Sequence, residues 1–143
     1  MPAELHGAEL EALLPHRHPF LLVDRIRVIE PGRRAIGVKL VSAGEWWCSA
    51  DAPTPLAMPF SLVIEALAQA TCGLLDGASG AIAYFMAADR VRFRHPARPG
   101  DELQLSVTLR SFRRGICRID GVATVDGRLV ASATLTSISR PAP

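Results

Sequence analysis

Lysine is nearly absent from this chain of 143 residues, since Lys39 is the only lysine among sixteen Lys and Arg residues. The formal net charge is only +2, and aromatic and basic residues do not interleave as they do in nucleic-acid-binding motifs. Arginine supplies the rest of the positive charge and suits bidentate pairing with phosphates or carboxylates. We therefore expect no nucleic-acid partner.

Cysteines and long apolar runs are also scarce. Cys48, Cys72 and Cys117 are widely spaced, form no CxxC pair, and follow no segment expected to be a secretory leader. This pattern predicts reduced packing thiols in a cytoplasmic protein, with no metal and no cofactor. The longest apolar segment is interrupted by polar residues from Glu65 onward, so we expect no membrane span.

The hydrophobic pattern predicts one α+β domain over residues 1–143, with a flexible N-terminus at 1–8 and a tail at 139–143. A short helix is expected over residues 8–14, and a long helix from Pro59 to near Gly77. Period-two alternation predicts strands over 19–30, 33–42, 81–94, 102–114, 115–125 and 128–139, the last two joined by an Asp126–Gly127 turn.

The simplest fold is about six antiparallel strands wrapped around one long helix. An exposed edge strand and a helix that is apolar nearly all round favour a second subunit.

Glu65 is the most informative residue, because it places a carboxylate inside an otherwise apolar helix. Such a group is destabilising unless catalysis, a partner chain or a substrate accounts for it. Gln69 lies one turn later on the same helix face. Cys72 lies on that face too, but nothing nearby in the sequence supplies the base that a nucleophilic thiol needs.

Several segments resemble the (3R)-hydroxyacyl-acyl-carrier-protein dehydratases of fatty-acid synthesis. The resemblance spans roughly residues 10 to 137 with nearly gap-free spacing, and it rests on four blocks: LPHRHPFLLVDR (14–25), MP with IEALAQA (58–59 and 64–70), RVRFRHPARPGD (90–101) and RRGICRIDGVATVDGRLVASATL (113–135). It implies a hotdog fold, a sheet wrapped around a central helix. It also implies dimers with two active sites at the subunit interface.

The resemblance also implies roles for single residues. Glu65 matches the helix carboxylate that protonates the departing hydroxyl, Gln69 matches the glutamine of the same motif, and Met58 and Pro59 match the Met-Pro that opens the helix. Backbone amides at that helix N-terminus would polarise the thioester carbonyl, as the helix dipole favours.

Two elements depart from the family's pattern. The Gly-His-Phe-Pro block that carries the base is Ala50-Asp51-Ala52-Pro53 here, and the glycine after Met-Pro is Phe60, which is expected to crowd the carbonyl site. An ordinary carboxylate such as Asp51 is a poor base for a carbon-bound proton.

The remaining histidines are expected to be surface or hydrogen-bonded structural residues, so that Glu65 has no imidazole partner. These are His6, His16, His18 and His95.

Three functions remain open from the sequence. The first is dehydration of a 3-hydroxyacyl thioester to a trans-2-enoyl thioester. The second is acyl binding without catalysis, or a partner subunit that lends Glu65 to a homologue's histidine. The third is a thioesterase that uses Glu65 or Asp51. In each case the ligand is a thioester of acyl carrier protein or coenzyme A, and the assembly is a homodimer, a trimer of dimers or a heteromer.

Arginines and tryptophans provide two further expectations. Arg90, Arg92 and Arg94 alternate along a predicted strand, so with Arg98 they could contact acyl carrier protein. Trp46 and Trp47 are expected to pack on the loop or on a dimer surface, with lining of the acyl site as the alternative.

Overall fold

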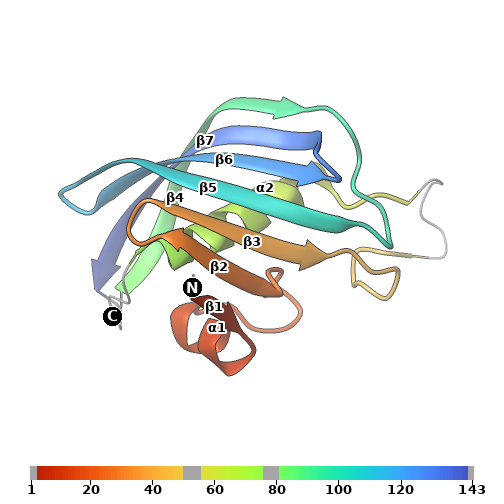
Figure 1. Cartoon of the computed structure of the whole chain (residues 1–143), viewed down its shortest axis with the longest axis horizontal. Helices are drawn as coiled ribbons and strands as arrows, with labels where there is room; N and C mark the ends of the chain where they lie inside the picture. The colour runs from red at the N-terminus through yellow and green to blue at the C-terminus, as the bar shows by residue number, and fades with distance from the viewer. Residues whose placement is uncertain (1–2, 50–55, 76–80, 142–143) are drawn as a thin grey trace.

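A computed structural model describes residues 3–49, 56–75 and 81–141. The elements in chain order are β1 (Glu4–His6), α1 (Ala8–Leu13), β2 (Arg25–Glu30), β3 (Arg34–Leu40), α2 (Phe60–Ala70), the 3-10 turn η1 (Thr71–Gly73), β4 (Ala81–Phe93), β5 (Glu102–Arg113), β6 (Ile116–Val125) and β7 (Arg128–Pro141) (Figure 1). Within these residues no helix has the length and apolarity needed to span a bilayer.

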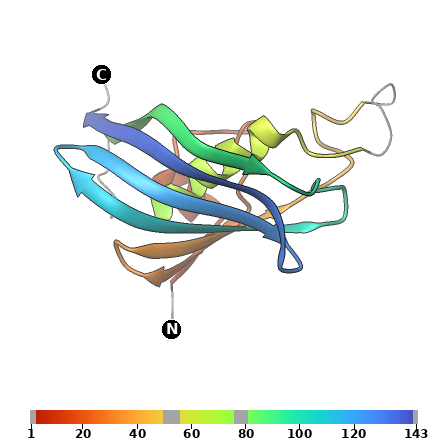
Figure 2. The same ribbon diagram turned by 90° about the horizontal axis from the view of Figure 1, so that it is seen from above.

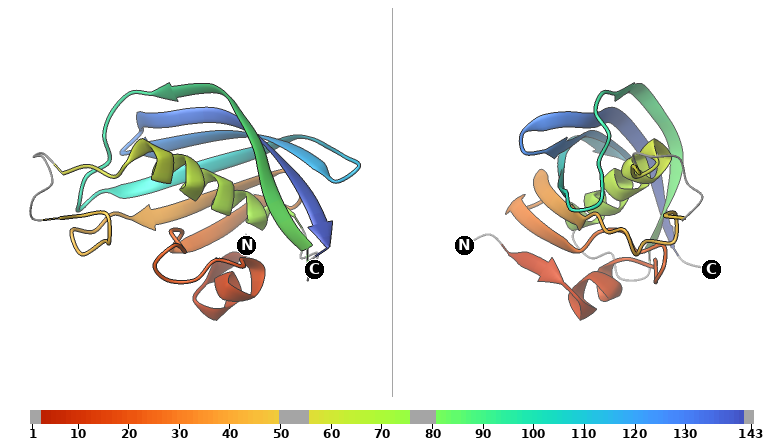
Figure 3. Two further views of the ribbon diagram at one scale, coloured as in Figure 1. Left: turned by 180° about the vertical axis from the view of Figure 1, so that it is seen from behind. Right: turned by 90° about the vertical axis from the view of Figure 1, so that its right-hand side faces the viewer.

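All seven strands form one sheet in the order β1-β2-β3-β5-β6-β7-β4, and every neighbouring pair is antiparallel. The sheet curves around α2, which lies in its concave face (Figure 3). The predicted hotdog arrangement is therefore confirmed, with one strand more than expected. The extra strand, β1, pairs with β2 inside the segment expected to be flexible, and β7 continues to Pro141, where a tail was expected.

Residues 19–24 were expected to belong to a strand, and this was wrong, because β2 begins only at Arg25. The backbone turns at Arg17, whose carbonyl oxygen accepts the N–H groups of Phe20 and Leu21. The N–H of Leu22 then donates to a side chain of α2 rather than to a neighbouring strand. Residues 16–22, which we call the α2-facing segment, thus lie against the helix instead of extending the sheet.

Helix α2 packs its buried face on the central strands. Leu67 is fully buried and lies over Gly121 of β6, where an added Cβ would come within 3.3 Å of the leucine side chain. Gly37 of β3 permits an even closer approach, since a Cβ there would lie 2.9 Å from the Cβ of Ala70. Truncating a fully buried leucine such as Leu67 to alanine typically costs about 2–5 kcal/mol.

The predicted turn between β6 and β7 is confirmed. Asp126 and Gly127 have φ values of 49° and 77°, and the flanking Val125 and Arg128 pair directly. Positive φ at both central residues is typical of the type I′ turn, whose twist matches that of the two strands.

Strand β4 lies at one edge of the sheet, next to β7, and runs past α2 (Figure 2). Its register with β7 shifts twice, between Phe85 and Ala87 and between Asp89 and Arg92. At each shift one extra residue bends the strand, as β-bulges do.

Candidate functional site

Glu65 lies in the second turn of α2 with 27% of its side chain exposed. Its Oε1 accepts a hydrogen bond from Nε2 of Gln69 at 3.0 Å and lies 3.2 Å from Nε2 of His16. The side chain is thus neither in bulk solvent nor unpartnered. The expectation that Glu65 has no imidazole partner was wrong.

Gln69 is fully buried, with 1% of its surface exposed, and its amide joins α2 to the α2-facing segment. Its Oε1 accepts the N–H of Leu22 at 2.9 Å, and its Nε2 donates to the carbonyl oxygen of Phe20 at 2.8 Å as well as to Glu65. The amide therefore uses its acceptor and both donor hydrogens, which is how a buried polar side chain avoids a desolvation penalty.

His16 reaches the helix from the α2-facing segment. Its ring lies 6.0 Å from the ring of Phe20, and 28% of its side chain is exposed. Its Nδ1 is buried and has no hydrogen-bond partner in the described part of the chain. The ring hydrogen that faces Glu65 is therefore the one on Nε2.

The electrostatics of this cluster favour an ionised carboxylate. Burial alone would raise the pKa of Glu65, but the hydrogen bonds from His16 and Gln69 and the attraction of His16 outweigh it and lower that pKa below its ordinary value. Burial, and then the negative charge of Glu65, raise the pKa of Cys72 to about 11. The Cys72 thiol is therefore neutral at physiological pH, which argues against a nucleophilic role.

A cavity of about 220 Å³ opens beside this cluster. Its polar side carries the carboxylate, imidazole and amide of Glu65, His16 and Gln69, and its walls come from α2, η1, β4, β6 and β7. The lining residues are His16, Phe20, Glu65, Ala68, Gln69, Thr71, Cys72, Ala83, Phe85, Ile119, Leu135 and Ser137. A carboxylate beside an imidazole in the wall of a cavity that also has apolar walls can give or take a proton next to a bound apolar chain.

The residues predicted at the start of α2 do not line this cavity. Met58 is buried, and its N–H donates to the carbonyl oxygen of Ala97 at 2.8 Å. Pro59 is the residue before the first turn. The ring of Phe60 stacks on Phe93 of β4, with ring centroids 4.4 Å apart.

Among the described residues, the predicted arginines are not part of the Glu65 cluster or of the cavity lining. Asp51 lies outside the described residues. Arg90, Arg92 and Arg94 are exposed, but a bulge between Asp89 and Arg92, with φ of 53° at Arg90, interrupts the expected alternation. Arg92 and Arg94 keep the two-residue spacing on either side of Phe93. No group of three or more His, Cys, Asp or Glu gathers as metal ligands within residues 3–49, 56–75 and 81–141.

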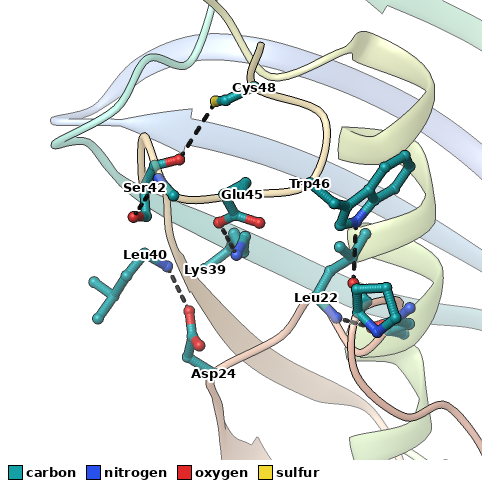
Figure 4. Close-up of polar contacts among 11 residues, drawn as sticks. Leu22, Asp24, Lys39, Leu40, Ser42, Glu45, Trp46 and Cys48 are labelled. Atoms are coloured by element: carbon teal, nitrogen blue, oxygen red, sulfur yellow. Dashed lines mark hydrogen bonds and ion pairs between the residues drawn. The ribbon is translucent and has the colours of Figure 1, made fainter. Parts of the chain in front are cut away.

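The loop of residues 42–48 carries Trp46 and Trp47, and an ion pair between Lys39 and Glu45 anchors it (Figure 4). Nε1 of Trp46 donates to the carbonyl oxygen of Pro19 at 3.1 Å, although 53% of the residue is exposed. Lys39, almost fully buried, forms an ion pair with Glu45 of the same loop. Neither tryptophan is among the residues that line this cavity; Trp46 lies on the loop surface, and Trp47 packs, partly buried, against the hydrophobic core.

Comparisons with known proteins agree on the family. The model of the FabA-like domain matches residues 14–134. The chain is 48% identical over 130 residues to a 3-hydroxyacyl-[acyl-carrier-protein] dehydratase FabZ of Roseiflexus sp. (strain RS-1), covering 89% of this chain and 91% of that protein.

Solved structures share the fold. The dehydratase heterocomplex ApeI:P from Xenorhabdus doucetiae superposes with a TM-score of 0.77 at 18% identity, covering 92% of this chain and 90% of the matched one. A hypothetical thioesterase with coenzyme A from Streptococcus pneumoniae gives 0.61 at 12%, covering 82% and 87%. Together with the family model and the close relative, these findings confirm the kinship expected from the sequence motifs: the chain belongs to the FabA-like family of 3-hydroxyacyl-acyl-carrier-protein dehydratases.

Proposed function

We propose that this chain dehydrates 3-hydroxyacyl thioesters to trans-2-enoyl thioesters, with acyl carrier protein as the carrier and the cytoplasm as the compartment. The observation that carries the proposal is a half-buried carboxylate, Glu65, held by hydrogen bonds in the wall of a cavity that also has apolar walls. The names of the close relatives support dehydration over the thioesterase and the non-catalytic binder.

Glu65 is the group that protonates the departing hydroxyl. Elimination breaks the C2–H and C3–O bonds: the C2 proton would pass to Asp51 or to the histidine of a second hotdog chain, and the hydroxyl leaves as water after receiving a proton from Glu65. Glu65 and His16 share a hydrogen bond and line the same cavity, which supports Glu65 as the donor to a hydroxyl bound there. Because the pKa of Glu65 is lowered, only the minor protonated fraction of this group donates at neutral pH.

The carrier would approach at the start of α2. Phe93 stacks on Phe60 there, and Arg92 and Arg94 flank Phe93 with exposed guanidinium groups. Exposed positive charge attracts the acidic surface of an acyl carrier protein and raises the rate of encounter.

A second candidate is a catalytic subunit that takes its base from another hotdog chain. The observation that favours it is the edge strand β4, which exposes a set of large apolar side chains beside its unpaired backbone: Tyr84, Phe85, Met86, Val91 and Phe93. Long apolar edges of this kind are normally covered by another chain. A homodimer would cover this edge, and a heteromer would also supply the histidine that Asp51 replaces.

The experiment follows enoyl absorbance after mixing the purified chain with 3-hydroxyacyl-acyl carrier protein, alone and with a second hotdog chain of the same organism. We expect Glu65→Gln to lower kcat by about 10²–10⁴-fold, and the exposed control Glu11→Gln of α1 to change it little. Release of free thiol without enoyl product would favour hydrolysis instead. Full activity in Glu65→Gln, or no enoyl product in either arrangement, would overturn the proposal.

A further inference from the structure

The two oxygens of Glu65 have different surroundings. Oε1 takes both contacts, from Nε2 of Gln69 and from Nε2 of His16. Oε2 receives no hydrogen bond from the described residues, on a side chain that lines the cavity. Among the described residues, one oxygen is therefore held by hydrogen bonds and the other receives none.

Gln69 fixes the direction of these contacts. Since its Oε1 accepts the N–H of Leu22, its amide nitrogen must face the other way, toward the carbonyl oxygen of Phe20 and Oε1 of Glu65. The same amide anchors the α2-facing segment that carries His16. The position of the imidazole over Glu65 is thus set by contacts within a single chain.

We propose that His16 is the positioning residue of Glu65: its Nε2–H holds Oε1 and thereby presents Oε2 to the C3 hydroxyl of the substrate. This rests on the proposed function, because it assigns the reacting oxygen of the same acid. It also implies that the acid half of the site is built from one chain, independently of Asp51 and Phe60.

The charged groups around the pair are few. Among the described residues that line the cavity, Cys72 of η1 is the only other titratable group, and the lining residues of β4, β6 and β7 are all uncharged. The guanidinium of Arg17 is directed back to the carbonyl oxygens of Leu14 and His16. His16 and Gln69 are therefore the two groups whose contacts lower the pKa of Glu65.

Removing the imidazole has a defined consequence. Loss of the hydrogen bond and of the attraction from His16 raises the pKa of Glu65, since both lower it in the native protein. An acid that must be protonated to react then stays competent to higher pH, so the basic limb of the kcat profile moves upward. At the same time the misplaced oxygen reacts more slowly, because a shift of about 1 Å in a reacting group can cost about 10²-fold.

The test compares His16→Phe, which keeps a ring and removes the donor, with His16→Gln, whose amide nitrogen can replace Nε2. His18→Gln is the matched control, because His18 is exposed in the same segment. The readouts are kcat and KM from pH 5 to 9 and the titration of the Glu65 carboxyl carbon by NMR. We expect His16→Phe to lower kcat by about 10–10²-fold with KM within about twofold, and to move both the basic limb and the Glu65 titration to higher pH. His16→Gln should recover most of the rate, and His18→Gln should match wild type.

The outcomes separate this inference from the proposed function. An active wild type whose His16→Phe variant keeps the same pH profile and the same Glu65 titration would overturn the positioning role while dehydration stands. A wild type that is inactive alone and with a second hotdog chain would overturn the proposed function. In that case an unchanged Glu65 titration in His16→Phe would refute the contact itself, and a raised one would support it.

Discussion

Replacing Gln69 by methionine should destabilise the protein markedly, because the buried amide of Gln69 joins α2 to residues 20 and 22. Methionine keeps the unbranched shape and removes all three hydrogen bonds. The N–H of Leu22 is then left buried without a partner, which costs about 1–3 kcal/mol. The carbonyl oxygen of the partly exposed Phe20 and the partly exposed carboxylate of Glu65 can each turn to water, so each of these losses costs only about 0.5–1.5 kcal/mol. The sum over the three bonds is about 2–6 kcal/mol.

Urea unfolding at a fixed chain concentration measures this loss, and Gln104→Met is the control because Gln104 is exposed on β5. The control should change the free energy of unfolding by no more than about 0.5 kcal/mol. If Gln69→Met loses no more than the control, the amide does not hold the α2-facing segment, and the placement of His16 over Glu65 lacks its support.

Three other predictions follow from buried polar groups. Lys39→Met should lower the free energy of unfolding by about 3–5 kcal/mol, because it leaves the nearly buried Glu45 unpaired. The double variant Lys39→Met/Glu45→Leu should recover most of this loss in urea unfolding. A loss below about 1 kcal/mol in the single variant would contradict this. Because the native pKa of Glu65 is lowered from its ordinary value of 4.5, its contribution to stability is present above that value and is lost as pH falls through the native value. Wild type should therefore lose more stability on acidification than Glu65→Gln, and parallel pH curves would refute it. With a pKa of about 11, Cys72 has a thiolate fraction on the order of 10⁻³ at pH 8. Iodoacetamide should therefore label Cys72 far more slowly in the native protein than in urea, as followed by peptide mass. Equal labelling rates would be inconsistent with the burial of this thiol.

The sequence predicted the sheet well where the alternation is regular. It predicted the start of α2, but the end expected near Gly77 was wrong, because the α-helix stops at Ala70 and tightens into a 3-10 turn over Thr71–Gly73. Strands β5, β6 and β7 follow their patterns almost to the residue, since each buries one face on α2. Strand β1 was missed because three residues are too short to show a period. The bulges of β4 were missed because an extra residue changes the register without changing the alternation in the sequence.

The candidate site was predicted only in part, and the missing residue was the imidazole. Glu65 and Gln69 lie one turn apart on a helix, so their proximity follows from local geometry. His16 lies in an irregular segment, and bonds from Gln69 across 47 and 49 residues determine where it goes. One signal could have found it, because a glutamine on a buried helix face needs backbone partners, and an irregular segment is where unpaired backbone groups occur.

The most direct test of this account is a crystal structure with a stable amide analogue of a 3-hydroxyacyl-pantetheine thioester. We predict that the acyl chain enters the cavity beside Glu65 and that the C3 hydroxyl lies within about 3.2 Å of Oε2, with His16 still on Oε1. An analogue whose hydroxyl binds away from Glu65, or a Glu65 side chain turned into bulk solvent when the analogue is bound, would contradict it.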